Sequence, residues 1–516
     1  MDMYDLLIYN GHVIDGSGKA GFTASIGIQN GKIVAVGDLQ EEANQVIDAT
    51  GLTVTPGFID SHSHSDSTLF ASTATVEKLE QGITTAISGQ CGGSAAPVRI
   101  PENMDAYKEG IGQKSQVLGS AATFLDTMKN VPLGAHHMCL IGAGNLRRMV
   151  MGMEQRNPTP EEMEQMKDML RGAMEHGALG VSFGLIYPPC AYFTEEEMTE
   201  LAKVVAKYNG IAAAHIRGEG ATVLKAQEEF INIVKNSGVR GIHSHMKSSG
   251  APAFRNKVPT LIKNIEDARA QGIDLYFDTY PYIASHTTLS VTVVPDSGRE
   301  LLKRMADPVE REKIKQWNYN ETWWKGDLSW VLIAKCAAYP QYEGKFIHEI
   351  AQERGTDHVD TALDMILDSK NACSACYFTM NESDVEAALS HPLGMVCTDS
   401  GAALGKTVFH PRLKASFPRA IARYTRREGL PSLEEMIRKM TSLPASVYGL
   451  KEKGHIAVGM DADLCIFDAK SFEDQATFAK PNQRCTGLNY VIVSGQVAVQ
   501  DSVYNGTLAG KLILRG

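Results

Sequence analysis

Short apolar segments alternate with helical patterns between residues 52 and 398, and this alternation limits the possible folds of the chain most strongly. Eight of these segments predict β-strands: Leu52–His62, Ile83–Ser88, His137–Gly142, Leu179–Phe183, Gly210–His215, Val239–His245, Ile273–Tyr280 and Gly394–Thr398. Helix patterns such as 160–176 and 195–208 separate most of them. Alternation of this kind is typical of parallel βα units, and eight units favour an α/β fold of the (β/α)₈ TIM-like barrel type. An open, doubly wound sheet is the alternative.

The two ends of the chain differ from this middle part because both read as short β-strands joined by glycine turns. Asn10-Gly11 and Asn30-Gly31 separate β-rich runs near the start, and Asn-Gly is a strong hairpin signal. Residues 461–516 have the same character. Each end is too short for a good sheet core of its own. We therefore expect one small β-sandwich domain, 1–54 plus 455–516, beside a barrel domain, 55–454.

The connection after the seventh predicted strand is unusually long. More than a hundred residues lie between Tyr282 and Gly394, far more than one βα connection requires. All four tryptophans fall inside it, at positions 317, 323, 324 and 330. We expect an inserted subdomain, residues 284–345, that covers the mouth of the barrel. The alternative is that the tryptophans form only the core of the insertion.

Charge and composition exclude several classes of partner. The net charge of −10 and the pI of about 5.9 disfavour binding to nucleic acid. No apolar run reaches the roughly 20 residues that cross a bilayer, and the first residues lack the pattern of a signal peptide. Nine cysteines, an odd number, argue against a disulfide framework. We expect a cytoplasmic protein without a membrane partner, and nothing in the sequence specifies an oligomeric state.

Residues that can bind a metal follow five of the eight predicted strands. They are His62 and His64 after strand 1, Cys91 after strand 2, His215 after strand 5, His245 after strand 6 and Asp399 after strand 8. Barrel active sites form at these strand ends, and thiolate and imidazole groups suit zinc. Each residue alone could be a polar strand tip or a buried thiol. Together they favour a metal site.

These strand-end residues resemble those of the metal-dependent amidohydrolase superfamily. A narrower and almost full-length resemblance is to its D-aminoacylase (N-acyl-D-amino-acid deacylase) family. The segments that carry it are Gln90–Pro97, Gly184–Pro189, Ser244–Lys247, Asp278–Tyr282 and His410–Arg412. The chain departs from the superfamily or the family at three places: strand 4 has no lysine, Ser400 follows Asp399 where glycine is usual, and Gly142–Asn145 replaces a Gly-His-Gly segment.

The resemblance implies zinc-dependent hydrolysis of the amide bond of N-acyl-D-amino acids, which releases a carboxylate and a free D-amino acid. It implies one tight zinc on Cys91, His215 and His245. A second, weaker site would consist of His62, His64 and Asp399 and would share Cys91, although one metal would be enough. Asp399 would be the catalytic acid–base residue.

The substrate is itself an anion, so cations near the site should bind its α-carboxylate. We expect this role for Lys247, Arg412, Tyr280 and Tyr282, with Arg217 and Tyr187 as further candidates. The alternative for the cations is an ordinary surface position. The tryptophans of the insertion favour an apolar substrate side chain, whereas Arg304 would suit an acidic one, and the sequence does not decide between them.

Two other functions fit parts of the sequence. One is an amidohydrolase that opens a cyclic amide, of the hydantoinase or dihydroorotase type. The other is a non-catalytic barrel that serves in assembly. The absent strand-4 lysine and the insertion argue against the first function. The complete set of strand-end residues argues against the second.

Overall fold

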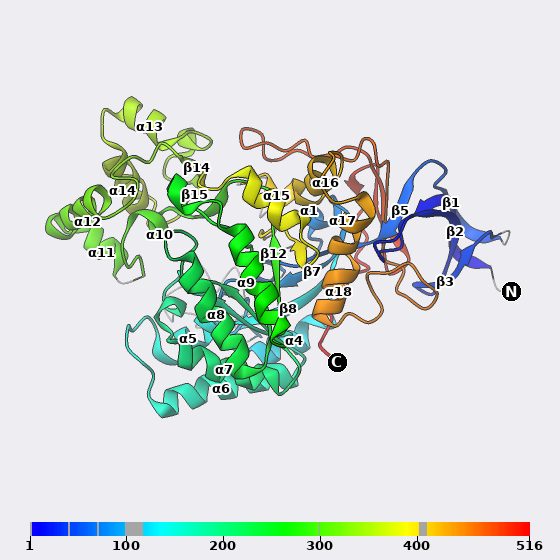
Figure 1. Ribbon diagram of the computed structural model, residues 1–516, viewed down its shortest axis with the longest axis horizontal. Coiled ribbons are helices and arrows are strands. Elements are labelled where there is room, and N and C mark those ends of the chain that lie inside the picture. The colour runs from blue at the N-terminus through cyan, green and yellow to red at the C-terminus, as the bar shows by residue number, and fades with distance from the viewer. Residues whose placement is uncertain (1–2, 40–41, 70–71, 99–116, 299, 402–409) are drawn as a thin grey trace.

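The computed structural model describes residues 3–39, 42–69, 72–98, 117–298, 300–401 and 410–516. In Figure 1 a central barrel lies between two other parts. The β-strands of the N-terminal end lie on one side of the barrel, and a subdomain that carries helices α11 to α14 lies on the other.

The central barrel is an eight-stranded sheet with the order β16-β12-β11-β10-β9-β8-β7-β6. Its strands are β6 (Phe58–Asp60), β7 (Ile83–Ser88), β8 (His136–Gly142), β9 (Gly180–Gly184), β10 (Ile211–His215), β11 (Arg240–His243), β12 (Leu275–Thr279) and β16 (Gly394–Val396). All pairs along this order are parallel. The two end strands meet where Asp399 donates its backbone N–H to the His62 carbonyl at 2.9 Å. The predicted barrel is therefore confirmed.

The first predicted strand, Leu52–His62, is wrong as a single element. It consists of β5 (Thr53–Pro56), which pairs with strands of the chain ends, and β6, which belongs to the barrel. Gly57 joins them, and a Cβ atom there would lie 2.2 Å from the Thr84 hydroxyl. The chain changes sheets at a residue without a side chain, directly after a proline that has no N–H to donate.

Helices cover the outside of the barrel (Figure 1). They are α1 (Val76–Leu79), α4 (Ala121–Met128), α5 (Ala143–Met151), α6 (Pro160–Glu175), α7 (Glu195–Ala206), α8 (Val223–Ser237), α9 (Val258–Ala270), α15 (Glu382–Ser390), α16 (Arg412–Tyr424), α17 (Leu433–Met440) and α18 (Ser442–Tyr448), with 3₁₀ turns η1 (Ser65–Thr68), η2 (Cys190–Tyr192) and η3 (Pro252–Phe254). Capping boxes begin α6 at Thr159 and α7 at Thr194. Both helices agree with the predicted segments to within two residues. Among the described residues, no helix is long and apolar enough to cross a membrane.

Strands from both chain ends join in one nine-stranded sheet, where the sequence predicted a small β-sandwich built from both ends. Its strands are β1 (Tyr4–Val13), β2 (Phe22–Gln29), β3 (Lys32–Gly37), β4 (Ala43–Asp48), β5, β17 (Leu464–Phe467), β18 (Leu488–Val493), β19 (Gln496–Gln500) and β20 (Val503–Tyr504). The antiparallel pair β5–β17 joins the two ends. Asn30-Gly31 is the predicted hairpin turn between β2 and β3, with positive φ at both residues. Asn10-Gly11 is not a turn, because it lies at an irregularity inside β1.

The long connection after β12 contains a separate three-stranded sheet, in the order β13-β15-β14. Its elements are β13 (Ser285–Thr288), α10 (Leu289–Val293), α11 (Leu301–Ala306), α12 (Pro308–Asn320), β14 (Val331–Cys336), η4 (Pro340–Tyr342), α13 (Ile347–Arg354), α14 (His358–Asp368) and β15 (Cys373–Tyr377). The insertion has its own hydrophobic core, separate from that of the barrel. The central strand β15 lies beyond the expected range 284–345. It carries the Cys373-x-x-Cys376 pair as buried thiols.

Candidate active site

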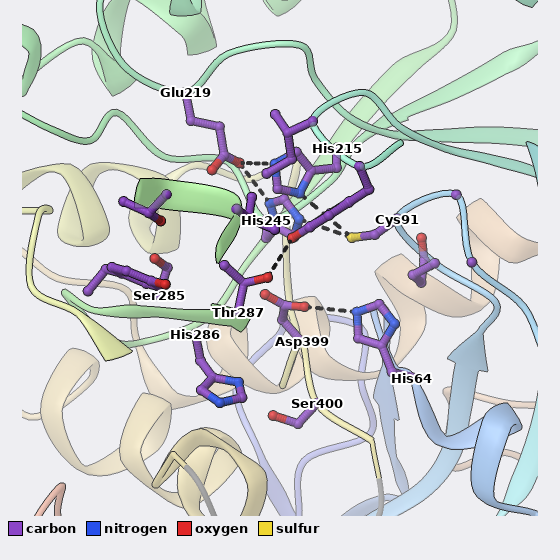
Figure 2. A pocket seen from close by; sticks show the side chains of 18 of the residues that line it. His64, Cys91, His215, Glu219, His245, Ser285, His286, Thr287, Asp399 and Ser400 are labelled. Carbon is purple, nitrogen blue, oxygen red and sulfur yellow. Dashed lines mark hydrogen bonds and ion pairs between the residues drawn. The ribbon is translucent and has the colours of Figure 1, made fainter. Parts of the chain in front are cut away.

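The residues that follow the barrel strands surround a cavity of about 780 Å³. His64, Cys91, His215, His245 and Asp399 all line it, and Figure 2 shows their side chains directed toward one another. This arrangement follows from the fold, because the carboxyl ends of parallel strands meet at one end of a barrel. The cavity is bounded on the far side by residues of the insertion.

Cys91 lies at the centre of a group of histidines. Its Sγ atom is 3.3 Å from Nε2 of His62, 3.3 Å from Nε2 of His245 and 3.8 Å from Nδ1 of His215. His64 contacts the group through Asp399, whose Oδ1 lies 3.1 Å from His64 Nε2. Three of the strands therefore bring nitrogen ligands to one thiol.

The donor atoms of this group fit a metal ion. One donor atom each of His62, Cys91, His245 and Asp399 lies within 4.8 Å of all the others, and the same holds for His215, Glu219 and His245. His215 Nε2, which faces Glu219 Oε1 at 3.7 Å, is buried without a hydrogen-bond partner within the described part of the chain. Thiolate, imidazole and carboxylate in one small volume are the donor set that zinc prefers.

Neighbouring groups stabilise the charged forms of Cys91 and His64. Burial opposes ionisation of the Cys91 thiol, but His62 and His245 outweigh it and hold its pKa well below the usual value. Burial also opposes protonation of His64, yet hydrogen bonds with Asp399 and Cys91 raise its pKa to about 9. A thiolate among imidazoles is the form that binds a soft metal.

Three residues of the site have left-handed backbone conformations. The φ angles are 54° at Cys91, 36° at His245 and 47° at Asp399. Such conformations cost non-glycine residues roughly 1–3 kcal/mol each and persist only where the surroundings enforce them. The close packing of the Cys91 loop is one such constraint, because a Cβ atom at Gly184 would lie 1.9 Å from the Cys91 carbonyl oxygen.

Asn145, which stands in a segment where the chain departs from the resemblance, fixes the loop that follows Cys91. Its side-chain amide donates to the carbonyls of Ser94 at 2.9 Å and Pro97 at 2.8 Å. Its oxygen accepts from the backbone N–H of Ser94 at 3.2 Å. The replacement therefore acts on the shape of the loop beside the cavity.

Glu219 is a site residue that the sequence did not predict. Its Oε1 atom lies 3.7 Å from His215 Nε2 and 3.2 Å from His245 Nδ1, on the side of both rings away from Cys91 (Figure 2). Lys247 Nζ donates to the same oxygen at 2.6 Å. Its position four residues after His215 was the available signal, since a carboxylate there stays close to the strand end.

Asp278 was also missed as a site residue. It is fully buried on β12, where its Oδ1 accepts the backbone N–H of His245 at 2.6 Å and lies 3.5 Å from His62 Nδ1. Asp278 thus contacts both His62 and His245 and helps to fix their positions. Its place at the end of an apolar strand, inside the segment Asp278–Tyr282 that resembles the family, was the available signal.

Three of the residues predicted to bind the substrate carboxylate lie together. Lys247 and Arg412 are 5.6 and 4.8 Å from the centre of the Tyr280 ring, and all three line the cavity. Tyr187 also lines it, with its ring 5.2 Å from that of His215 and its hydroxyl 3.3 Å from Thr287. Arg412 and Lys247 are buried, so neither is a surface cation.

Tyr282 and Arg217 lie elsewhere. Tyr282 packs edge-on against His410, with the Arg419 guanidinium 4.5 Å from its ring centre, and it is not among the described residues that line the cavity. Arg217 pairs with Glu229 at 2.9 Å and donates to two backbone carbonyls outside the cavity. The backbone after each strand turns these two side chains away, which spacing alone does not reveal.

Comparison with known proteins places the chain in a family. The sequence pattern of the amidohydrolase family matches residues 45–499. D-aminoacylase of Alcaligenes xylosoxydans xylosoxydans is 34% identical over 99% of this chain and 98% of its own length, and N-acyl-D-glutamate deacylase of the same organism is 34% identical over 95% and 93%. The crystal structure of N-acyl-D-glutamate deacylase from Bordetella bronchiseptica, complexed with zinc and a phosphonate mimic of the tetrahedral intermediate, superposes with a TM-score of 0.85, at 31% identity and full coverage of both chains. The chain therefore belongs to the amidohydrolase family and, within it, to the D-aminoacylases.

Proposed function

We propose that this chain catalyses zinc-dependent hydrolysis of N-acyl-D-amino acids to a carboxylate and a free D-amino acid. One observation carries the proposal: a Cys91–histidine cluster and the buried cations Lys247 and Arg412 line the same cavity. A metal held by the cluster would polarise the amide carbonyl, and the two cations would bind the α-carboxylate that every N-acyl amino acid carries.

Cys91, His215 and His245 would hold the tight zinc, and His62, His64 and Asp399 would form a weaker site that shares Cys91. When bound, zinc supplies a Lewis acid that polarises the amide carbonyl and lowers the pKa of water. The distances from Cys91 Sγ to His245 Nε2, 3.3 Å, and to His215 Nδ1, 3.8 Å, support this assignment. Glu219 would fix both ligand histidines from behind, since it faces His215 Nε2 and His245 Nδ1, the ring atoms directed away from Cys91.

Asp399 moves the proton in this mechanism. It takes a proton from the attacking water as the new C–O bond forms, and it gives that proton to the amine nitrogen as the C–N bond breaks. Burial raises the pKa of this carboxyl, but Arg412 and His245 outweigh burial and hold the pKa well below its usual value. Asp399 is therefore ionised and ready to accept the proton.

Arg412, Lys247 and Tyr280 bind the α-carboxylate of the substrate. The guanidinium fork suits a carboxylate, and the Tyr280 ring lies next to both cations. Tyr187, whose hydroxyl stays protonated because burial raises its pKa, lies across the cavity as a hydrogen-bond donor. Fixed contacts to the carboxylate and the carbonyl leave one side of the Cα atom for the side chain, which distinguishes D from L substrates.

A panel of substrates with zinc analysis tests the proposed function. We expect hydrolysis of N-acetyl-D-amino acids, no hydrolysis of the L-enantiomers and loss of activity with zinc removal. Hydrolysis of dihydroorotate or hydantoins in place of the linear amides would favour the cyclic-amide function. A zinc-free, inactive protein that forms defined assemblies would favour the non-catalytic one.

The cysteines support a reducing location. All nine lie in the described part of the chain, and none of them forms a disulfide. We propose that the protein works in the cytoplasm, where thiols stay reduced.

A further inference from the structure

The walls of the cavity differ in chemistry. The metal-ligand candidates and the cations Lys247 and Arg412 lie at the barrel end, whereas the insertion contributes an aromatic wall. We call this the tryptophan wall; its residues are Trp323, Trp324, Trp330 and Tyr377. Trp324 and Trp330 also pack against the core of the insertion. These tryptophans therefore serve both roles that the sequence left open, since they pack in the insertion and face the cavity.

The tryptophan wall begins beside the carboxylate-binding residues. Gly250 follows Lys247 by three residues, and a Cβ atom at Gly250 would lie 3.3 Å from Nε1 of Trp323. The Gly250 backbone N–H also donates to the Thr379 carbonyl at 3.0 Å, close to the end of β15. This contact attaches the barrel loop to the insertion at the place where the substrate carboxylate is expected.

The position of the wall indicates which part of the substrate faces it. The α-carboxylate and the side chain are attached to the same Cα atom, whereas the acyl group lies beyond the amide. A substrate held by Lys247 and Arg412 therefore directs its side chain toward the tryptophan wall. Its acyl group extends away from that side chain. Gly92, Gly93 and Asn145, which belong to the Cys91 loop and the segment bonded to it, also line the cavity.

The wall offers no cation to an acidic side chain within the described part of the chain. Lys247 pairs with Glu219 and Arg412 with Asp399, and both are needed for the α-carboxylate. Arg148, the other described lysine or arginine in the lining, lies on α5, and its guanidinium donates to the Pro188 carbonyl at 3.5 Å. Arg304 points away, because its guanidinium donates to the Pro295 and Asp296 carbonyls.

Two histidines close to Arg412, His286 and His410, also line the cavity, and burial lowers the pKa of both. His286 belongs to β13, and its Nε2 atom forms a 3.0 Å hydrogen bond with the Ser374 hydroxyl. Burial and the nearby Arg412 lower its pKa to about 3. A carboxylate placed against this wall would lose its water shell without gaining a positive partner, which is costly.

The rings of the wall form a preformed apolar surface. Trp323 and Trp330 stack with their centres 5.0 Å apart and their planes 29° from parallel, and Tyr377 lies 5.9 Å from Trp330. We infer that the enzyme prefers N-acyl-D-amino acids with large apolar or aromatic side chains over those with acidic side chains. This inference rests on the proposed deacylase function and selects among the specificities that occur in the relatives.

The test compares kcat/KM of the zinc-loaded enzyme for N-acetyl-D-phenylalanine, D-leucine, D-alanine and D-glutamate. We expect the first two to exceed D-glutamate by about 100-fold or more, since an unpaired buried charge costs several kcal/mol. A preference for D-glutamate, or equal rates for all four, overturns the inference while leaving the deacylase function intact. Failure to hydrolyse any of the four, with zinc bound, overturns the proposed function instead.

Variants locate the preference in the wall. We expect Trp323→Ala to lower kcat/KM for D-phenylalanine and D-leucine about tenfold or more and to leave D-alanine nearly unchanged, which also shows that the variant is folded. Trp323→Phe should restore most of the loss. Trp317→Ala is the matched control, because Trp317 packs against Trp324 at 5.8 Å but is not in the described lining. An equal loss for all substrates in Trp323→Ala would contradict a specificity role.

Discussion

Arg412 Nη1 lies 2.7 Å from Asp399 Oδ2, and both side chains are almost completely buried at the cavity. The sequence predicted two separate roles for them, a carboxylate clamp and a catalytic base. The structure joins these roles in one ion pair. A substrate carboxylate that binds Arg412 would share the positive charge of the guanidinium with Asp399. Substrate binding and the basicity of Asp399 are therefore linked through this contact.

Substitution of Arg412 tests this link. Arg412→Ala should raise KM for N-acetyl-D-amino acids at least about tenfold, because a charge-assisted bidentate contact is lost. It should lower kcat as well, since Asp399 loses its partner, while zinc content stays the same. Steady-state kinetics with elemental analysis measure all three. Arg427→Ala, at an exposed pair with Glu386, is the control; an unchanged KM in Arg412→Ala would remove Arg412 from the clamp.

Asp399→Asn separates the proton-transfer role from metal binding. The amide keeps the shape but cannot accept a proton, so kcat should fall by about 10²- to 10⁴-fold. The zinc of the tight site should remain, because Asp399 is not among its three proposed ligands. Zinc content and kcat are measured on the same preparation. A variant that turns over near the parent rate would exclude Asp399 as the base.

Cys91→Ala should abolish tight zinc binding, since the thiol lies 3.3–3.8 Å from three imidazoles and is their common neighbour. Elemental analysis after dialysis against a weak chelator should find little zinc in this variant. Cys139→Ala, a buried thiol on β8 outside the cavity lining, should retain zinc like the parent. Full zinc occupancy in Cys91→Ala would contradict the ligand set.

Glu219→Gln tests the residue that the sequence analysis missed. The amide cannot fix His215 and His245 as a carboxylate does, and loss of such a partner typically costs 10- to 100-fold in metal affinity. Competition with a chromogenic chelator measures the zinc affinity without an activity assay. Glu229→Gln is the matched control, because Glu229 pairs with Arg217 away from the cavity. Equal affinities for the two variants would show that Glu219 does not support the metal site.

Lys439 predicts a pH dependence of stability far from the active site. It is fully buried on α17, donates to the Leu389 carbonyl, and burial lowers its pKa from 10.5 to about 7. The unfolded chain therefore binds more protons between pH 7 and 10.5. Burial of Lys439 therefore lowers the free energy of unfolding by its full amount below about pH 7. This loss disappears as the pH rises to 10.5, because the free energy of unfolding increases by up to about 1.4 kcal/mol per pH unit in that range.

Lys439→Met removes this titration. The variant should have a higher Tm than the parent at pH 7, and the difference should shrink toward pH 10, as followed by circular dichroism. Lys451→Met, at an exposed position, should show a pH-independent difference. A constant Tm difference for Lys439→Met would mean that Lys439 stays charged in the folded protein.

The barrel was predictable because its signals are local. Apolar strands, capping residues and glycine turns follow from the preferences of neighbouring residues, and α6 and α7 agree with the sequence to within two residues. One failure lies where two sheets compete for one segment. Thr53–Pro56 and Phe58–Asp60 are both buried, and only their partner strands decide which sheet each one joins.

The sequence by itself determined the fold class and the positions of Cys91, His215, His245 and Asp399, because residues at the carboxyl ends of barrel strands must meet. The tertiary structure alone decided what those residues contact. It pairs Arg412 with Asp399, places Glu219 behind two histidines and turns Arg304 away from the cavity. A side chain that follows a strand takes its direction from the loops and the insertion packed around it, and that packing depends on residues distant in the sequence.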